Sequence, residues 1–228
     1  MNDFPVPDPL LRAVVFDLDG LMFDTEVLYQ EVGSTVLARR GCEFTAELLD
    51  QMMGRQSAKA LQIMIDYHGL DITVPELADE SMEVMRELLE TRLTPMPGLL
   101  TLLDALEAAE IPKGIATSST RDFLDHVLLL ANLTDRFRFT LSGDDIEHGK
   151  PAPDVYLLAA EKHNCQPAEI LVLEDSQLGC QAAVAAGAYT VAVPGGHSLT
   201  HVFPGAKFIA DSLVDNRIYR ALNIATDS

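Results

Sequence analysis

The stretch Arg12-Ala-Val-Val-Phe-Asp17-Leu-Asp19-Gly20 ends an apolar run abruptly in two aspartates and a glycine. The four apolar residues at 13–16 predict a buried β-strand. Because residues two apart along a strand point to the same side, Asp17 and Asp19 would project together from its end. Placing two acids there is unfavourable unless a cation or a reacting group needs them. The pair therefore predicts a functional site at the end of the first strand.

The composition is that of an ordinary globular protein with a large acidic excess. The 228 residues include 35 Asp and Glu against 16 Lys and Arg, a formal net charge of -19. Such a surface repels nucleic acid and anionic membranes, so we expect neither as a partner. It also repels a phosphorylated ligand, so an anion site would need positive potential from a cation, a lysine and helix N-termini.

The cysteines and the N-terminal residues predict a cytoplasmic protein. Cys42, Cys165 and Cys180 show no CxxC or Cys/His metal spacing, and residues 1–10 lack the basic and apolar regions of a signal peptide. An odd cysteine count without a signal indicates a reducing compartment. No apolar run reaches the length of a membrane span. Separately, we expect the protein to be a monomer.

Short apolar runs alternate with helical patterns from Gly98 onward. This alternation predicts a parallel sheet covered by helices on both faces, the Rossmann-like doubly wound α/β class. The strands are expected at residues 13–16, 113–116, 138–141, 170–173, 190–193 and 208–210.

Only helical patterns lie between the first strand and the next βα unit. They run over about 25–40, 45–53, 57–68 and 75–93, and Thr73-x-x-Glu76 has the form of a capping box. This block predicts an inserted helical cap domain at 27–93. The α/β catalytic core would then comprise 10–26 and 94–228, after an N-terminal extension at 1–9.

Polar side chains follow the expected strands, where open α/β sheets bind ligands. Taken singly, each is more commonly a helix cap or a surface group, but together they converge on one sheet edge. Carboxylates of this kind bind Mg²⁺, which takes one or two of them together with substrate phosphate, and this predicts phosphoryl transfer. The residues are Asp17, Asp19, Thr117, Ser118, Lys150, Glu174 and Asp175.

In these positions the chain resembles the haloacid dehalogenase-like superfamily. Four motifs occur in order: Asp17-Leu-Asp-Gly20, Thr117 at a strand end, Lys150-Pro-Ala-Pro-Asp154 and Glu174-Asp-Ser176. The helical insert resembles the cap of the subgroup that holds small-molecule phosphatases and β-phosphoglucomutase. Residues 17–26 and 142–154 look most like the pseudouridine-5′-phosphatase branch.

The resemblance implies a Mg²⁺-dependent hydrolase that acts on a small phosphorylated metabolite through an aspartyl-phosphate. Asp17 would be the nucleophile and a Mg²⁺ ligand. Asp19 would be the general acid and base, and its backbone carbonyl would bind the metal. Asp175 would bind Mg²⁺, with Glu174 as a further ligand or a support for one.

The resemblance also implies which residues hold the phosphoryl group and read the leaving group. Thr117, Lys150 and the backbone amide of Ser118 would bind the phosphoryl oxygens. Substrate specificity would reside in the helical insert, at Tyr29, Gly54, Arg55, Gln56 and Lys59.

Two other functions stay open at this point, a phosphosugar mutase and a phospho-acceptor signalling module. A β-phosphoglucomutase resembles the core, but Tyr29 and Ser57 stand where the mutase has a hinge histidine and a cap arginine. A signalling receiver domain is short, has no helical insert and carries its acceptor after a later strand. Dehalogenases and phosphonate hydrolases lack an acid at the position of Asp19.

Overall fold

The computed structural model describes residues 7–52 and 57–225 of the 228-residue chain. The chain divides into two compact units. One unit contains the chain up to Asp24 and from Thr94 onward, and the other contains Thr25–Leu93.

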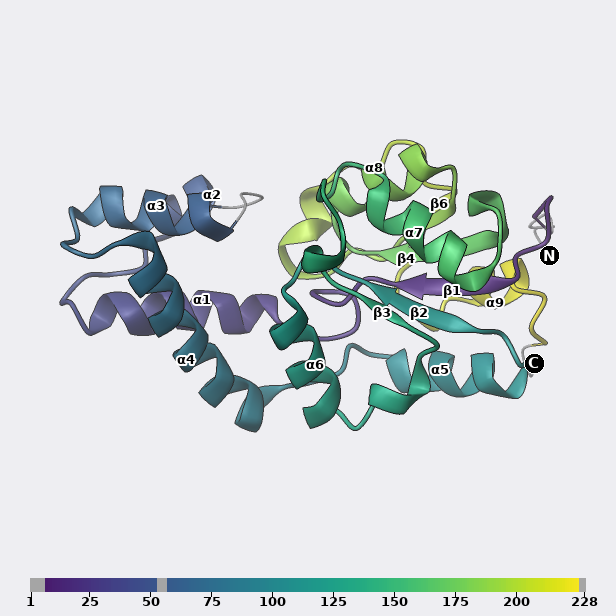
Figure 1. Ribbon diagram of the computed structural model, residues 1–228, viewed down its shortest axis with the longest axis horizontal. Helices are drawn as coiled ribbons and strands as arrows, with labels where there is room; N and C mark the ends of the chain where they lie inside the picture. The colour runs from purple at the N-terminus through teal and green to yellow at the C-terminus, as the bar shows by residue number, and fades with distance from the viewer. Residues whose placement is uncertain (1–6, 53–56, 226–228) are drawn as a thin grey trace. The chain divides into compact units, whose positions relative to one another are not determined.

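A six-stranded parallel sheet forms the centre of the larger unit (Figure 1). The strand order β3-β2-β1-β4-β5-β6 places β1 inside the sheet, with the chain winding first to one side of it and then to the other. This order confirms the predicted doubly wound α/β fold. The strands are β1 (Ala13–Phe16), β2 (Lys113–Ala116), β3 (Thr140–Leu141), β4 (Ile170–Glu174), β5 (Tyr189–Ala192) and β6 (Phe208–Ile209).

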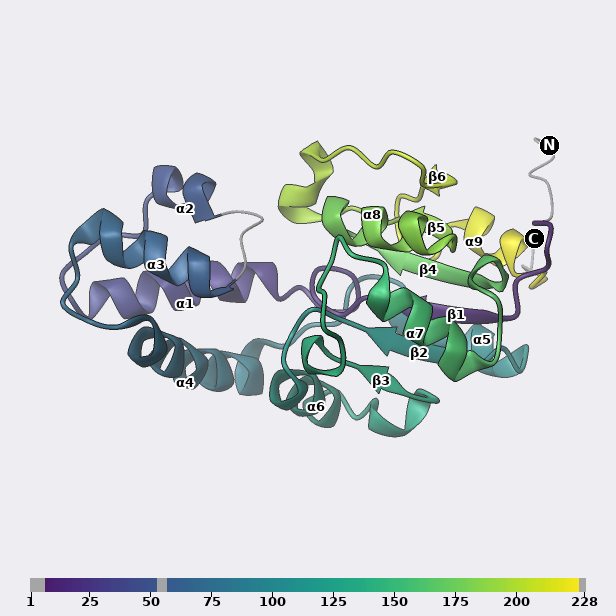
Figure 2. The ribbon, with the colours of Figure 1, turned by 45° about the horizontal axis from the view of Figure 1, so that its top comes forward.

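Helices cover both faces of this sheet (Figures 1 and 2). Helices α5 (Leu99–Ala108) and α6 (Arg121–Leu130) lie on one face, and α7 (Asp154–His163) and α8 (Gln177–Ala186) lie on the opposite face. The short helix α9 (Asn216–Ala221) follows β6. Every residue of β1 and β4 is buried, because strands covered on both faces are shielded from water on both sides.

The strand β3 is shorter than the predicted run at 138–141. The strand consists of Thr140 and Leu141, in register with Ile115 and Ala116 of β2, although the Arg138 amide and the Phe139 carbonyl also hydrogen-bond to β2. As an edge strand, β3 has one neighbour, so its extended conformation is supported from one side alone. The pairing nevertheless brings the loop after β3 to the carboxyl end of β2.

The smaller unit consists of helices α1 (Glu26–Ala38), α2 (Ala46–Met52), α3 (Ser57–His68) and α4 (Val74–Arg92). Within this unit, α1 packs along α4 and α2 packs on α3 (Figure 2). Arg39 and Arg40 at the end of α1 bind Glu80 of α4 at 2.9 and 2.5 Å. The predicted capping box at the start of α4 is confirmed, because the Thr73 hydroxyl accepts the Glu76 amide and the Glu76 carboxylate accepts the Thr73 amide.

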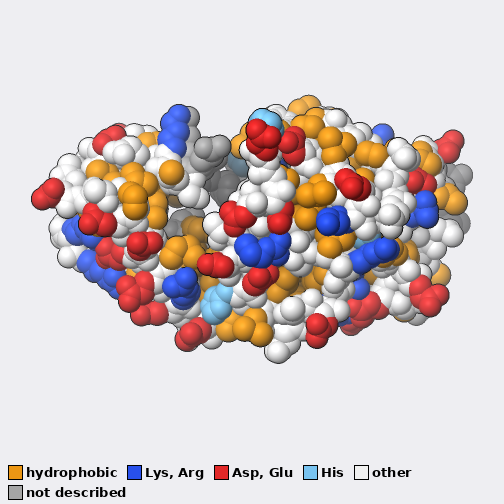
Figure 3. Space-filling view, viewed as in Figure 1, with side chains coloured by type: hydrophobic (Ala, Val, Ile, Leu, Met, Phe, Trp, Pro, Cys, Tyr) orange, Lys and Arg blue, Asp and Glu red, His pale blue; other side chains and the backbone are white. Residues whose placement is uncertain are grey.

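Acidic side chains are spread over the face of the protein that Figure 3 shows. Figure 3 shows acidic side chains distributed over the visible face of each unit, with basic side chains interspersed. Among the residues that the structure describes, no helix combines the length and the apolar character that a bilayer crossing requires.

The central strand β4 provides a test of how much core packing contributes to stability. Leu173 is fully buried, whereas Leu129 on α6 is 68% exposed. We expect Leu173→Ala to lower the free energy of unfolding by about 2–5 kcal/mol, because it removes buried methyl groups and leaves a cavity. Leu129→Ala should change the free energy of unfolding by less than about 0.5 kcal/mol. Urea unfolding followed by circular dichroism measures both, and equal losses would contradict the assignment of β4 to the core.

His163 at the end of α7 predicts a pH dependence of stability. Its side chain is buried against the ring of Phe139, with ring centroids 4.6 Å apart. Burial, together with the nearby Arg138, lowers the pKa of His163 from 6.5 to about 4. The unfolded chain therefore binds a proton that the folded chain excludes between these two pH values, so stability falls as the pH falls from 6.5 toward 4. The variant His163→Gln should lose less stability over this range than the wild type in urea unfolding at pH 7, 5.5 and 4.5.

Candidate active site

The carboxyl ends of β2, β1 and β4, three neighbouring strands, position the predicted site residues. Asp17 follows β1 directly, and its backbone amide donates to the carbonyl of Leu173 at 3.0 Å. Thr117 follows β2, and its amide donates to Leu141 of β3 at 3.0 Å. Glu174 is the last residue of β4. Sheet hydrogen bonding thus fixes the backbone from which these side chains project.

Lys150 joins the strand ends through its ammonium group. The Nζ atom donates to Asp17 Oδ1 at 2.5 Å, to Glu174 Oε1 at 2.6 Å and to the carbonyl of Ala116 at 3.1 Å. Only 6% of the Lys150 side chain is exposed. Charge-assisted hydrogen bonds of this kind are strong, and here they bring together residues that lie more than 130 positions apart in the chain.

Glu174 serves as the anchor of this lysine. Its Oε1 also accepts the Tyr156 hydroxyl at 2.9 Å, and its Oε2 accepts the amide and the hydroxyl of Ser176 at 3.0 and 2.9 Å. A Cβ atom at Gly179 would lie 1.6 Å from Oε1, so glycine leaves the space that the carboxylate fills. Because both of its carboxylate oxygens already accept hydrogen bonds, Glu174 is better placed to hold the Lys150 ammonium than to bind a metal ion.

Tyr156 and Gly179 also lie against Glu174 in the candidate site, and neither was predicted from the sequence. Each lies close to a motif, Tyr156 two residues after Asp154 and Gly179 three residues after Ser176. One helical turn separates Gly179 from Ser176, which indicates that both face Glu174. The Lys150 ammonium also lies 5.1 Å from the centre of the Tyr156 ring, within the range of a cation–π contact.

Asp19 is half-buried and contacts the loop that follows β2. Its Oδ2 accepts the Ser119 hydroxyl at 2.6 Å and the Thr117 hydroxyl at 3.4 Å. Thr117 is buried, whereas Ser118 is exposed. Thr117 and Ser118 were predicted from the sequence as site residues, whereas Ser119, the last residue of the same Thr-Ser-Ser run, was not.

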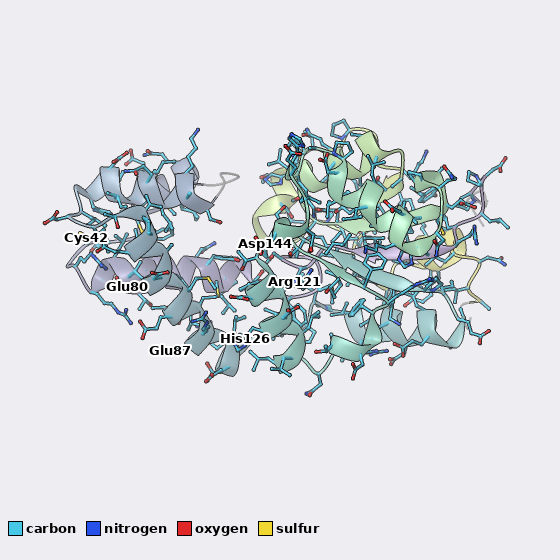
Figure 4. All side chains as sticks on the ribbon, viewed as in Figure 1. Cys42, Glu80, Glu87, Arg121, His126 and Asp144 are labelled. Atoms are coloured by element: carbon cyan, nitrogen blue, oxygen red, sulfur yellow. The ribbon has the colours of Figure 1, made fainter. Side chains whose placement is uncertain are left out.

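The loop after β3 is held against the loop after β2. The Gly143 amide donates to the Ser119 carbonyl at 2.8 Å, and the Arg121 amide donates to Asp144 Oδ2 at 2.8 Å. Arg121 and Asp144 lie side by side at the start of α6 (Figure 4). The Arg121 guanidinium additionally binds Asp145 at 2.5 Å. These contacts connect two polar loops of the site into one support.

Asp175 lies against the turn that follows Asp19. The Asp175 side chain is buried, and a Cβ atom at Gly20 would lie 2.5 Å from its Oδ2. Gly20 also has a backbone φ of +75°, which L side chains rarely adopt. Glycine is therefore required at this position both by its backbone conformation and by the close approach of Asp175.

The charges of the site are unbalanced. The Lys150 ammonium contacts two buried carboxyl groups, those of Asp17 and Glu174, and the carboxyl group of Asp175, the residue after Glu174, is buried as well. Burial raises the pKa of Asp17 above its ordinary value, and the charges of Glu174 and Asp19 act in the same direction, whereas Lys150 opposes the shift because it favours the carboxylate. Burial acts to lower the pKa of Lys150, but Asp17 and Glu174 reverse this and raise it well above its ordinary value.

This donor set suits Mg²⁺. Within residues 7–52 and 57–225, no three His, Cys, Asp or Glu side chains form a ready-made metal cage. Mg²⁺ does not require one, because it binds one or two carboxylates and completes its octahedron with water and substrate phosphate. Asp17 and Asp175, with the backbone carbonyl of Asp19, would supply such oxygen ligands, and the excess of acid over base favours a divalent cation.

The predicted specificity residues belong to the helical unit. Tyr29 lies on α1 with 47% of its surface exposed, and Lys59 is exposed in the first turn of α3. The predictions at Gly54, Arg55 and Gln56 lie outside the described residues.

The hydrogen bond from Tyr156 to Glu174 gives a prediction with a matched control. We expect Tyr156→Phe to lower the free energy of unfolding by about 1–3 kcal/mol, because a buried carboxylate loses one of its donors. The Tyr219 hydroxyl is also buried but has no hydrogen-bond partner among the described residues. Tyr219→Phe should therefore leave the unfolding free energy nearly unchanged. Thermal and urea unfolding measure the two variants, and equal effects would contradict the role of Tyr156.

The chain is similar to several known proteins. A (DL)-glycerol-3-phosphatase of Arabidopsis thaliana is 37% identical over 194 residues, which cover 81% of this chain and 64% of the relative, less than two thirds of its length. A probable pseudouridine-5′-phosphatase of Drosophila melanogaster is 34% identical, covering 81% of this chain and 84% of the relative. The structure of a putative β-phosphoglucomutase from Thermotoga maritima is 28% identical and superimposes with a TM-score of 0.77, over 93% of this chain and 97% of that one.

The family itself follows from a match over most of the chain. The model described as haloacid dehalogenase-like hydrolase matches residues 14–193, from β1 to the residue after β5. This range contains all four motifs in which the sequence resembles the superfamily. The chain belongs to the haloacid dehalogenase-like hydrolase family.

Proposed function

We propose that this protein is a Mg²⁺-dependent phosphatase that hydrolyses small phosphate monoesters, of the sugar or nucleoside type, through an aspartyl-phosphate on Asp17. The observation that carries the proposal is the contact of Lys150 with Asp17, beside a second acid, Asp19, that hydroxyl groups hold in place. The names of the two relatives, a glycerol-3-phosphatase and a probable pseudouridine-5′-phosphatase, support the same reaction class.

The reaction has two steps in which protons and bonds balance. An Asp17 carboxylate oxygen attacks phosphorus, the ester P–O bond breaks, and Asp19 gives its proton to the leaving oxygen. A water molecule then attacks the phosphorus of the aspartyl-phosphate and loses a proton to Asp19. Inorganic phosphate leaves, and the Asp17 carboxylate is restored with Asp19 protonated again.

The remaining groups bind and neutralise. Lys150, Thr117 and the Ser118 amide hold phosphoryl oxygens, and Glu174 keeps Lys150 in position. Mg²⁺, bound by Asp17, Asp175 and the Asp19 carbonyl, would neutralise the phosphate charge that the acidic protein otherwise repels. The unit Thr25–Leu93 acts as a cap, and its residues Tyr29, Lys59 and 54–56 read the leaving group.

A phosphosugar mutase is the alternative that one comparison favours, through the putative β-phosphoglucomutase structure. Against it stand Tyr29 and Ser57, at positions where the mutase resemblance calls for a histidine and an arginine. The two functions differ in their products. A mutase converts β-glucose 1-phosphate to glucose 6-phosphate without net phosphate release, whereas a phosphatase releases inorganic phosphate.

The nucleophile and the metal give the decisive assay. We expect purified protein with Mg²⁺ to release phosphate from a panel of monoesters, and Asp17→Asn to lower kcat by more than about 10³-fold, because the amide is a poor nucleophile. The exposed Asp104 on α5 gives a matched control, and Asp104→Asn should retain full activity. EDTA should abolish phosphate release and added Mg²⁺ should restore it. Equal activity of Asp17→Asn and wild type, or full activity in EDTA, would contradict the mechanism.

A further inference from the structure

In the loop after β2, Ser119 contacts Asp19 more closely than Thr117 does, although Thr117 is the residue that the motif predicts. The Ser119 hydroxyl lies 2.6 Å from Asp19 Oδ2, whereas the Thr117 hydroxyl lies 3.4 Å from the same oxygen. A separation of 2.6 Å is at the short end of the range for O–H···O hydrogen bonds, and 3.4 Å is longer than that range. Ser119 is therefore a stronger hydrogen-bond partner of Asp19 than Thr117 is.

The two hydroxyl groups have different second contacts. The Thr117 hydroxyl also accepts the Ser119 amide at 3.0 Å, so it takes part in the turn that presents Ser119. The Thr117 amide still pairs with Leu141 of β3. Ser119 comes two residues later and lies in the loop that follows the sheet. Thr117 thus shapes the loop, and Ser119 extends from the loop to the acid.

Ser119 is supported from the opposite side by the loop after β3. Its carbonyl accepts the Gly143 amide at 2.8 Å, and a Cβ atom at Gly143 would lie 2.6 Å from the Ser118 carbonyl. Glycine therefore permits the two loops to approach closely. The bond from the Arg121 amide to Asp144 holds the same pair of loops together (Figure 4). The serine is thus anchored at its amide, its carbonyl and its hydroxyl.

We propose that Ser119 is the positioning residue of Asp19, a role that rests on the proposed function. A hydroxyl that donates to Oδ2 leaves the carboxyl proton on Oδ1, in a fixed direction. General acid catalysis requires the proton within hydrogen-bond reach of the leaving oxygen, and a small misplacement lowers the rate strongly. Ser119 acts through Asp19 and does not itself transfer the proton.

This role predicts a dependence on the leaving group. An alkyl phosphate such as glycerol phosphate needs its leaving oxygen protonated, whereas the nitrophenolate of p-nitrophenyl phosphate leaves without a proton. Loss of a positioned acid should therefore lower kcat/KM for the alkyl phosphate much more than for the aryl phosphate, because kcat/KM reports the steps through phosphoryl transfer to Asp17. Loss of a phosphate-binding group should lower both values equally.

The experiment compares Ser119→Ala, Ser119→Cys and Ser119→Thr on the two substrates with Mg²⁺. We expect Ser119→Ala to lower kcat/KM about 10- to 100-fold for glycerol phosphate and less than about 3-fold for p-nitrophenyl phosphate. Ser119→Thr keeps a hydroxyl and should recover part of the loss. Ser119→Cys keeps the shape with a weaker donor and should show the same selectivity to a smaller extent. Thr101→Ala removes an exposed hydroxyl on α5 and should change neither value.

The outcomes separate this inference from the proposed function. Thermal unfolding of each variant shows that the fold is intact, and Ser119→Cys tests the same selectivity should Ser119→Ala fail to fold. Equal losses on both substrates, or no loss on either, would overturn the positioning role while leaving the phosphatase assignment intact. A wild-type protein that is inactive on both substrates, or an active Asp17→Asn variant, would instead overturn the proposed function on which the role rests.

Discussion

The Lys150 ammonium, held between Asp17 and Glu174, is the contact on which the site depends. Three strand ends and the loop after β3 meet at this one charge, and its desolvation is offset only because carboxylates face it at 2.5 and 2.6 Å. Tyr156, Ser176 and Gly179 in turn keep Glu174 in place. An acidic protein thereby maintains a positive group at the point where an anionic substrate would bind.

The parallel sheet explains why such distant residues meet. Each βα unit ends its strand at the same edge, so the polar residue that follows a strand reaches a shared site without special folding of the loops. The loops are then fixed to each other, Gly20 against Asp175 and Gly143 against Ser119. The result is a preorganised set of donors and acceptors, which is what phosphoryl transfer requires of a protein.

The local patterns were sufficient to predict most of the fold. Strands β1 and β2 begin and end at the predicted residues, and β1 is recognisable because a strand buried on both faces reads as a continuous apolar run. The capping box at Thr73 was also predictable, since both partners lie within one turn. The edge strand β3 was predicted too long, because its length is set by pairing with β2 rather than by its own residues. Ser119, Tyr156 and Gly179 were missed, because their importance arises from contacts with Asp19 and Glu174 that lie far away in the sequence.

The sequence by itself determined the α/β class and the order of the four motifs, and it led to the prediction that Asp17, Asp19, Lys150 and Asp175 are site residues. These follow from residue type and spacing, which the chain carries regardless of how it folds. Only the tertiary structure decided that Glu174 holds Lys150 through Oε1 while its Oε2 binds Ser176, and that the Ser119 hydroxyl lies closer to Asp19 Oδ2 than the Thr117 hydroxyl does. Hydrogen bonds depend on distances of a few tenths of an ångström, and those distances are set by the packing of loops from different strands rather than by any single stretch of sequence.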